Sequence, residues 1–345
     1  MKLSQLGEFA IIDRVIKKIS PAYAKKNILV LPGDDAFISE FPGRYFVCTT
    51  DILIEGSHFL STWQSFFKKK EHLFRALGYK CLAVNISDLS AMGDVQPLYC
   101  CIGLGLPPDT SLENLNNFYD GLIRLAKKHN INIIGGDTNS SPLWVISITL
   151  IGTVQKNKIV RRSGAKPGEY IYITGNMGDS SAGLEILQKG KNNFRDTPLF
   201  KHLIRKHFYP PVKLKQAKAV SRIATSMIDS SDGLFSSIEQ LCKASGAGAE
   251  IYADNIPVSK QLRAYSKNFT RAMDFALYGG EDYELVFTSG QQKIPAGQRV
   301  FRVGRITKTK GIRLYSGSGG KNKKELEIKK TGFEHFRNPA YQFSS

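Results

Sequence analysis

The sequence predicts an α/β fold made of two domains. The chain has 345 residues, and single hydrophobic cores stop growing near about 250–300 residues. Apolar runs of strand length alternate with segments of helical spacing in both halves of the chain. Charge and glycine content rise together over residues 156–168, so we place the boundary there. The expected domains are residues 1–155 and 156–336, followed by a tail at 337–345.

The first half mixes helices and strands from its beginning. Ile12, Ile16 and Ile19 share one face of an amphipathic helix expected at 9–19. Apolar runs and helical spacing then predict, in order, strands at 28–31 and 45–48, a helix at 71–86, a strand at 98–106, a helix that begins with a capping box at 110–113 and ends near 130, and strands at 131–134 and 146–150.

The second half repeats this mixture after the boundary. The same signals predict strands at 170–174, 227–228, 250–252, 283–288 and 299–306, and helices from 180, after Pro210-Pro211 and at 234–243. Residues 175–183 open one of these helices. Their glycines fit a phosphate cradle and a tight packing turn equally well.

The chain is strongly basic. Lys and Arg number 48 against 30 Asp and Glu, which gives a formal net charge of +18. The basic residues are dispersed, and the densest cluster, at 321–330, also contains glutamates. A solvated surface that attracts small phosphorylated molecules therefore explains the charge better than a specific nucleic-acid site does.

No membrane segment or secretion signal is expected. Polar residues interrupt the longest uncharged stretch, at 138–155, whereas a spanning helix needs about 20 mostly apolar residues. Glu8 and Asp13 interrupt the apolar character of the N-terminal segment. The five cysteines form no Cys-x-x-Cys pair and are expected to be reduced, mostly buried thiols. These features predict a cytoplasmic protein.

Five short acidic motifs carry the chemical signal. Each lies beside glycine or at the end of an apolar run, and they occupy residues 33–35, 49–51, 87–88, 135–137 and 229–233. Oxygen ligands at strand-to-loop junctions suit Mg²⁺, which keeps water ligands and bridges substrate phosphates. A single aspartate after glycine is more often a turn residue, but the repetition favours metal-assisted chemistry on a phosphorylated substrate.

The motifs of the two common classes of ATP-using enzyme are absent. The sequence contains neither G-x-x-x-x-G-K-[ST] nor an H-R-D loop with a D-F-G partner. Any use of ATP must therefore rely on another arrangement, in which glycines beside the acids let backbone N–H groups approach phosphate.

Several longer motifs resemble thiamine-monophosphate kinase. They are GDDA at 33–36, TDILIEGSHF at 50–59, LGYKCLAVNISDLSAMG at 77–93, GGDT at 135–138, RSGAKPG at 162–168, LYGGEDYEL at 277–285 and GFEHF at 332–336. The resemblance covers residues 7–336 in order. It implies a two-domain aminoimidazole ribonucleotide synthetase-like fold, which uses ATP without a P-loop, and a homodimer whose N-terminal strands form a shared sheet or barrel.

The resemblance also implies an activity and a set of site residues. The activity is transfer of a phosphoryl group from ATP to thiamine monophosphate, which gives thiamine diphosphate in the last step of its biosynthesis. The implied Mg²⁺ ligands are Asp34, Thr49, Thr50, Asp51, Asp88, Asp137, Asp229 and Asp232. The implied ATP contacts are Gly136, Asp137, Arg162 and Ser231, and the implied thiamine-phosphate contacts are His58, Glu281 and Phe333. Asp34, Asp51, Asp88, Asp137 and Asp229 are the expected metal carriers of catalysis.

The side-chain chemistry agrees with these implied roles. The planar guanidinium of Arg162 can grip a phosphate, the ring of Phe333 can stack on a cationic ring, and the Glu281 carboxylate can accept from a ring amine. Without the resemblance, each has a plainer reading as a surface or packing residue.

The sequence departs from the family pattern at three places. Asp94 stands where a small residue is expected and is either a bystander or a perturbation of Asp88. The segment at 63–70 is longer than the family pattern, which indicates a surface insertion. Residues 139–142 stand where the family has a more basic loop. Two alternatives stay open, namely another ATP-using member of the same superfamily and a non-catalytic, basic nucleic-acid-binding protein.

Overall fold

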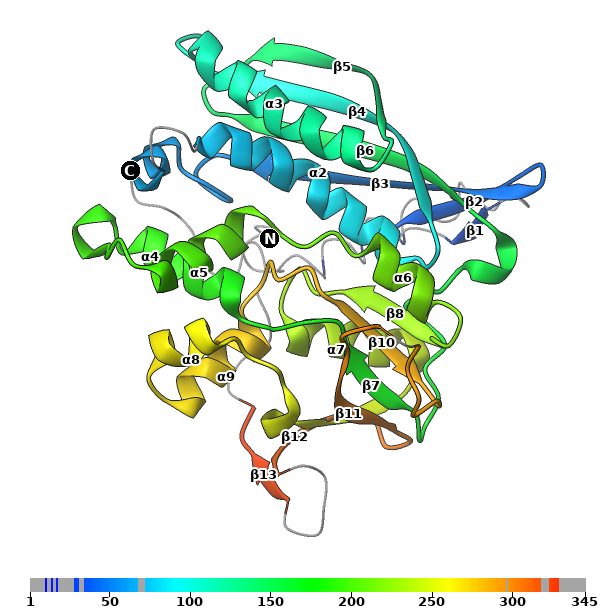
Figure 1. Ribbon diagram of the computed structural model, residues 1–345. Helices are drawn as coiled ribbons and strands as arrows, with labels where there is room; N and C mark the ends of the chain where they lie inside the picture. Colours follow the sequence, from blue (N-terminus) through cyan, green and yellow to red (C-terminus); the bar gives the residue numbers. More distant parts are fainter. Residues whose placement is uncertain are drawn as a thin grey trace.

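The computed structural model describes residues 10, 14, 17, 28–30, 34–67, 72–295, 297–317 and 323–328. Two mixed β-sheets with helices packed between and beside them form the molecule (Figure 1). Most of the helix expected at 9–19, the tail at 337–345 and Phe333 lie outside the described residues. Among the described residues, no helix combines the length and the apolar character needed to cross a membrane.

The first sheet has six strands in the order β1-β2-β3-β6-β4-β5. They are β1 (Ile28–Val30), β2 (Phe37–Phe41), β3 (Arg44–Ile54), β4 (Gln96–Leu106), β5 (Asn132–Ser140) and β6 (Val145–Val154). β4 and β5 run parallel and are connected through α3 (Leu112–Lys128), whereas the other neighbours are antiparallel. Along β6, buried and half-buried residues alternate, as expected for a strand covered by helices on one face.

Helix α2 (Leu73–Ala91) lies between this sheet and the second half of the chain (Figure 1). Nearly all of its residues are buried, which is typical of a helix covered on every side. It approaches α3 closely, because a Cβ atom on Gly78 would lie 1.9 Å from the Phe118 carbonyl oxygen and one on Gly121 would lie 1.9 Å from the Arg75 carbonyl oxygen. Glycine at both positions therefore permits the contact.

The second sheet has seven strands in the order β13-β12-β9-β11-β7-β10-β8. They are β7 (Tyr170–Ile173), β8 (Ser226–Asp229), β9 (Gly248–Tyr252), β10 (Leu285–Ser289), β11 (Phe301–Thr307), β12 (Gly311–Ser316) and β13 (Lys324–Leu326). The helices of this half are α4 (Asp179–Gln188), α5 (Pro198–Phe208), α6 (Leu214–Val220), α7 (Leu234–Ser245), α8 (Lys260–Ser266) and α9 (Phe269–Tyr278).

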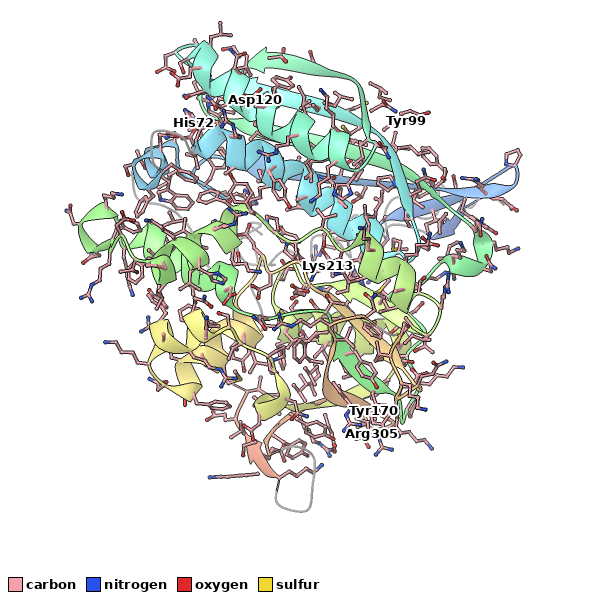
Figure 2. All side chains as sticks on the ribbon, viewed as in Figure 1. His72, Tyr99, Asp120, Tyr170, Lys213 and Arg305 are labelled. Carbon is pink, nitrogen blue, oxygen red and sulfur yellow. The ribbon has the colours of Figure 1, made fainter. Side chains whose placement is uncertain are left out.

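The two halves share a core. The largest hydrophobic cluster joins the first sheet, α2 and α3 to residues of α4, α5 and α8, such as Leu184, Phe208 and Leu262. Lys213, labelled near the middle of the molecule in Figure 2, forms a buried ion pair with Glu284 at 2.5 Å. The first sheet ends at Val154 and the second begins at Tyr170, and the domain division at 155/156 stays a prediction.

Most predicted elements are present, but several boundaries were wrong. The strand expected at 45–48 runs from 44 to 54, and the one expected at 131–134 runs from 132 to 140, so two acidic motifs lie inside strands. Helix α2 continues to Ala91, which places Asp88 within the helix and not after it. These strands and this helix run further because neighbouring elements supply hydrogen bonds and contacts that the local sequence does not reveal.

Three further differences are local. The N-cap of α3 is Ser111, whose side chain accepts from the Asn114 backbone N–H, so the capping box predicted at 110–113 was wrong by one residue. The prediction of a surface insertion at 63–70 fails at Trp63, which is 3% exposed and packs against Phe208. β2, α5, α8 and α9 were not predicted, although the N-caps Thr197, Ser259 and Asn268 mark the starts of these helices.

Candidate functional site

A cavity of about 440 Å³ lies where the two halves meet. The end of β3 and the turn after it form one wall, and the N-terminal part of α4 and the loops after β8 and α9 form the other. Six predicted site residues line it, namely Thr50, Asp51, His58, Ser231, Asp232 and Glu281. Residues up to 231 positions apart in the sequence therefore face one space, because β3 and the loop after α9 lie on opposite walls.

The side chains of the acidic motif at 49–51 alternate between the two faces of the first sheet, because they lie within strand β3. Thr50 is exposed, and its hydroxyl lies 2.8 Å from that of Thr149 on β6. The Thr49 hydroxyl donates to Asp88 Oδ2 at 2.6 Å, which ties the strand to α2. Burial raises the pKa of Asp51 to about 6.

Two further carboxylates lie beside this motif. Asp229, at the end of β8, is 3% exposed and accepts a hydrogen bond from the Ser87 hydroxyl of α2 at 2.6 Å. Burial raises its pKa to about 7. Burial together with the charges of Asp51, Asp229 and Asp35 raises the pKa of Asp88 well above its usual value. Gathered carboxylates thus oppose one another's ionisation in a region that excludes water.

Asp34 and Asp35 complete the cluster, and both contact Arg162. The backbone N–H of Arg162 donates to Asp34 Oδ2 at 3.1 Å, and its guanidinium donates to Asp35 Oδ1 and to Gln240 Oε1, each at 2.8 Å. Arg162 is thus tied to Asp35 and Gln240, and its predicted contact with ATP stays a prediction. Burial raises the pKa of Asp35 to about 7. Sequence reasoning missed Asp35, although it stands directly after Asp34 in the same motif.

The donor set suits a hard divalent cation. Asp35 Oδ2 and Asp51 Oδ2 are buried without a hydrogen-bond partner, which is unfavourable unless a cation or water satisfies them. Among the described residues, no three His, Cys, Asp or Glu side chains converge tightly enough to enclose a metal ion by themselves.

Asp137 and Gly136 lie apart from this cluster. Asp51 on β3 is paired with Ile148 on β6, which is paired with Ile102 on β4, which is paired with Gly136 on β5. Neighbouring strands are ~4.8 Å apart, so three spacings place the two motifs about 14 Å from each other. The whole of β5 is exposed, and the Asp137 carboxylate accepts only from its neighbours Thr138 and Asn139 among the described contacts. Asp137 also faces away from α2. It is paired with Gly103 and through it with Ser147, which lies on the face of the first sheet that α2 and α3 leave uncovered. One chain therefore does not bring Asp51 and Asp137 to the same ion.

Glu281 is held by two buried basic side chains that sequence reasoning missed. Lys80 Nζ lies 2.8 Å from Glu281 Oε1, and His207 Nδ1 lies 3.1 Å from Glu281 Oε2. Lys80 and His207 are each 1% exposed. Burial opposes ionisation of Glu281, but Lys80 and His207 outweigh it and lower the pKa of the carboxyl far below its usual value. A lysine within the largely apolar stretch LGYKCLAV, at 77–84, was the available signal.

Three smaller predictions have outcomes in the structure. His58 lines the cavity, where its Nδ1 accepts from the Ile54 backbone N–H at 3.0 Å. Asp94 is a bystander to Asp88, because it pairs with Lys158 at 3.0 Å. The predicted cradle at 175–183 is a packing turn, since the N–H groups of Gly178 and Ser180 already donate to the Asp282 carboxylate.

Family models and known proteins match nearly all of the chain. Residues 33–154 match the AIR synthase related protein, N-terminal domain, and residues 166–316 match its C-terminal domain. Thiamine-monophosphate kinase of Buchnera aphidicola subsp. Schizaphis graminum is 35% identical over 96% of this chain and 99% of its own length. This chain belongs to the thiamine-monophosphate kinase family. The family resemblance and the two-domain fold predicted from sequence are thus confirmed.

Other members of the family agree with this assignment. The enzyme of Aquifex aeolicus is 31% identical over 97% of this chain and all of its own length. The solved structure of AaThiL complexed with AMPPCP and TMP superposes with a TM-score of 0.83 at 30% identity, covering 97% of this chain and 99% of that one.

Proposed function

We propose that this protein transfers the γ-phosphoryl group of ATP to thiamine monophosphate, giving thiamine diphosphate and ADP. The observation that carries the proposal is one cavity lined both by Asp51, a member of the carboxylate cluster with an unpartnered oxygen, and by the paired Glu281 carboxylate. The names of the family members and the complex of AaThiL with an ATP analogue and TMP support the choice of substrates. The hydrogenase maturation protein HypE shares the fold at only 15–18% identity.

The carboxylate cluster would hold the metal ions that bring the two anionic substrates together. Asp34, Asp35, Asp51, Asp88 and Asp229 would hold Mg²⁺, together with Thr49, Thr50 and Asp232 at the edge of the cluster. Mg²⁺, when bound, supplies charge neutralisation between the donor and acceptor phosphates. Because a phosphate oxygen is already an anionic nucleophile, the chain needs no general base and acts mainly by holding the two groups in line.

The opposite wall suits the organic part of the acceptor. Glu281 is ionised by Lys80 and His207, so it can accept from the ring amine of thiamine, and His58 faces the same space. Ser231 lies beside Glu281 on this wall, where it can contact a phosphate. The predicted stacking role of Phe333 stays a prediction.

The first test is an assay of thiamine diphosphate formation from ATP, Mg²⁺ and thiamine monophosphate. Asp51→Asn should reduce turnover to background while the protein stays folded, because the amide keeps the shape and removes the charge that holds the metal. Asp94→Asn is the matched control and should retain activity, since Asp94 pairs with Lys158 outside the cluster. Full turnover by Asp51→Asn at limiting Mg²⁺ would contradict the metal assignment.

We further propose that the protein works as a homodimer built on the uncovered face of the first sheet. That face exposes large apolar residues, namely Ile52 at 48%, Ile54 at 37% and Tyr99 at 43%. Figure 2 labels Tyr99, which lies on β4. Exposed apolar surface beside an open edge strand favours association with another chain. A second copy would also explain how Asp137 and Gly136 reach ATP, since their own chain does not carry them to the cluster.

A complementation experiment tests this arrangement. Asp51→Asn and Asp137→Asn should each be inactive, but dissociating and reassociating an equal mixture should recover about a quarter of wild-type activity, because half the dimers are mixed and each has one intact site. Mixing each variant with itself is the control. No recovery, or light scattering that gives a 38.4 kDa monomer, would contradict the shared site. The cytoplasmic location stays a prediction.

A further inference from the structure

A second cavity, of about 490 Å³, lies on the far side of α4 from the first. It is bounded by α4, the start of α5, and α8 and α9, and it is as large as the first cavity and within the ~300–1,000 Å³ range of small-molecule sites. Ser181 and Leu184 of α4 line the first cavity, whereas Ile186 and Lys189 of the same helix line the second. The two are therefore separate spaces divided by one helix.

The second cavity has an apolar interior and a cationic rim. Leu199, Phe200 and Tyr265 provide much of the apolar surface, and the rings of Phe200 and Tyr265 meet edge to face at 5.8 Å between centroids. The rim carries four cations, Lys189, Arg195, Lys267 and Arg271, and no residue lining the cavity is acidic. Such a combination suits a small molecule with an apolar ring and an anionic group.

The positive charge of the rim is only partly neutralised. Glu185, just behind the rim, pairs with Lys189 and with Arg271 and accepts from the Tyr265 hydroxyl at 2.6 Å. These contacts hold one face of the cavity rigid. Arg195 and Lys267 have no side-chain ion pair or hydrogen bond recorded within the described part of the chain. Two cations on the rim thus remain available to an anion.

The start of α5 adds to this field. Thr197 caps the helix by accepting from the Phe200 backbone N–H, and Thr197, Leu199 and Phe200 all line the cavity. The positive end of the α5 dipole therefore points into the same space as the free cations, and it favours an anion there.

We propose that this second cavity binds an aromatic phosphate ester, with the ring on the apolar interior and the phosphate between Arg195 and Lys267. Arginine and lysine both bind phosphate well, the former through two parallel N–H donors. The proposal concerns a site outside the first cavity and does not depend on the reaction proposed there.

Binding of 1-naphthyl phosphate, followed by its fluorescence at low ionic strength, tests the site. The wild-type protein should show saturable binding, and Arg195→Gln/Lys267→Gln should weaken it by about tenfold or more, since hydrogen bonds to charged groups are each worth about tenfold in affinity. Lys156→Gln/Lys310→Gln, which removes two exposed lysines elsewhere, should bind as the wild type does. Glu281→Gln, in the first cavity, should also leave this binding unchanged.

Two competitors test the chemical class. Inorganic phosphate and 1-naphthol should each displace the probe far less well than unlabelled aromatic phosphate, because each has only half of the recognised features. Unchanged affinity in Arg195→Gln/Lys267→Gln, or an equal loss in the lysine control, would overturn the site. Displacement by inorganic phosphate as effective as by the ester would overturn the assignment to an aromatic ligand.

Discussion

Lys80 carries an ammonium group that is buried within α2, a helix with few exposed residues. Removing such a charge from water is unfavourable unless a partner compensates it, and here the Glu281 carboxylate does so at 2.8 Å from Nζ. Glu281 also has a positive φ of 66°, which is unusual for a residue other than glycine. A paired, conformationally fixed carboxylate facing a cavity is better explained by ligand orientation than by stability, to which buried ion pairs contribute little.

Lys80→Met tests this positioning role. The variant should lose about 3–5 kcal/mol of unfolding free energy, because it leaves the Glu281 carboxylate without its closest partner. Affinity for thiamine monophosphate should fall while that for ATP stays nearly constant, as measured by calorimetric titration. Lys80→Met/Glu281→Gln removes both charges and should recover stability without recovering acceptor affinity. Normal acceptor affinity in both variants would show that the ion pair is only structural.

The sequence indicated the aspartates of the site better than it indicated the basic side chains that contact the acidic residues. Aspartates beside glycine are visible in any single sequence, and the cluster of Asp51, Asp88 and Asp229 was expected. Lys80 and His207 are 127 positions apart, and nothing in either segment shows that α5 packs against α2. The contact of Arg162 with Asp35 was hidden for the same reason, because it depends on packing between distant segments.

Helices α2 and α3 show how one glycine pair fixes the position of an element. α2 carries Lys80, Ser87 and Asp88, so its distance from α3 affects both the acceptor wall and the carboxylate cluster. The reciprocal approach of Gly78 and Gly121 to facing backbone carbonyls leaves no space for a side chain. Backbone atoms cannot move aside as a flexible side chain can, so the helices must separate if either glycine is replaced.

Gly121→Ala should therefore destabilise the protein by about 1–3 kcal/mol, the usual effect of overpacking a core. Chemical denaturation measures the loss, and turnover should fall as well because α2 is displaced. Gly290→Ala is the control, since a Cβ atom there would meet nothing within 4 Å and its φ is not positive. If the two variants have equal stability, the close approach of α2 and α3 does not constrain the fold.

The kinds of elements could be predicted from the sequence, whereas their limits could not. Alternation at 146–150 and helical spacing after Ser111 were sufficient to identify β6 and α3. β3 runs past Cys48 to Ile54 because β6 pairs with it along that whole length. A strand's end depends on its neighbour, so Thr49, Thr50 and Asp51 were assigned to a strand end when they lie within the strand.

For the whole molecule, the net charge of +18 is expected to act on small anions and not on a specific nucleic acid. Any binding of DNA or RNA should be weak, independent of base sequence and lost between low and physiological salt, because counterion release dominates such contacts. Filter binding with a duplex and a single-stranded RNA of several sequences measures this. A tight complex with one RNA that resists physiological salt would contradict it.

The order of the strands in the two sheets could not be predicted from the sequence. Strand orders such as β9 between β12 and β11 depend on long-range pairing, which local patterns do not encode. The position of Asp137 could not be predicted either, because a motif of the right residues does not show where the fold places them. The family resemblance supplied the overall fold that local patterns left undetermined.

Helix α4 separates two cavities and contributes side chains to both. It is ten residues long, and a helix this short moves as a unit, so a ligand that shifts or stiffens it on one side changes the walls on the other. Thermodynamic reciprocity then requires any change in affinity to be mutual and equal in factor. An aromatic phosphate that tightened acceptor binding threefold would itself be bound about threefold more tightly when the acceptor is present. Helix α4 would thus couple the two cavities allosterically, and the concentration of a second metabolite would change the turnover of the enzyme.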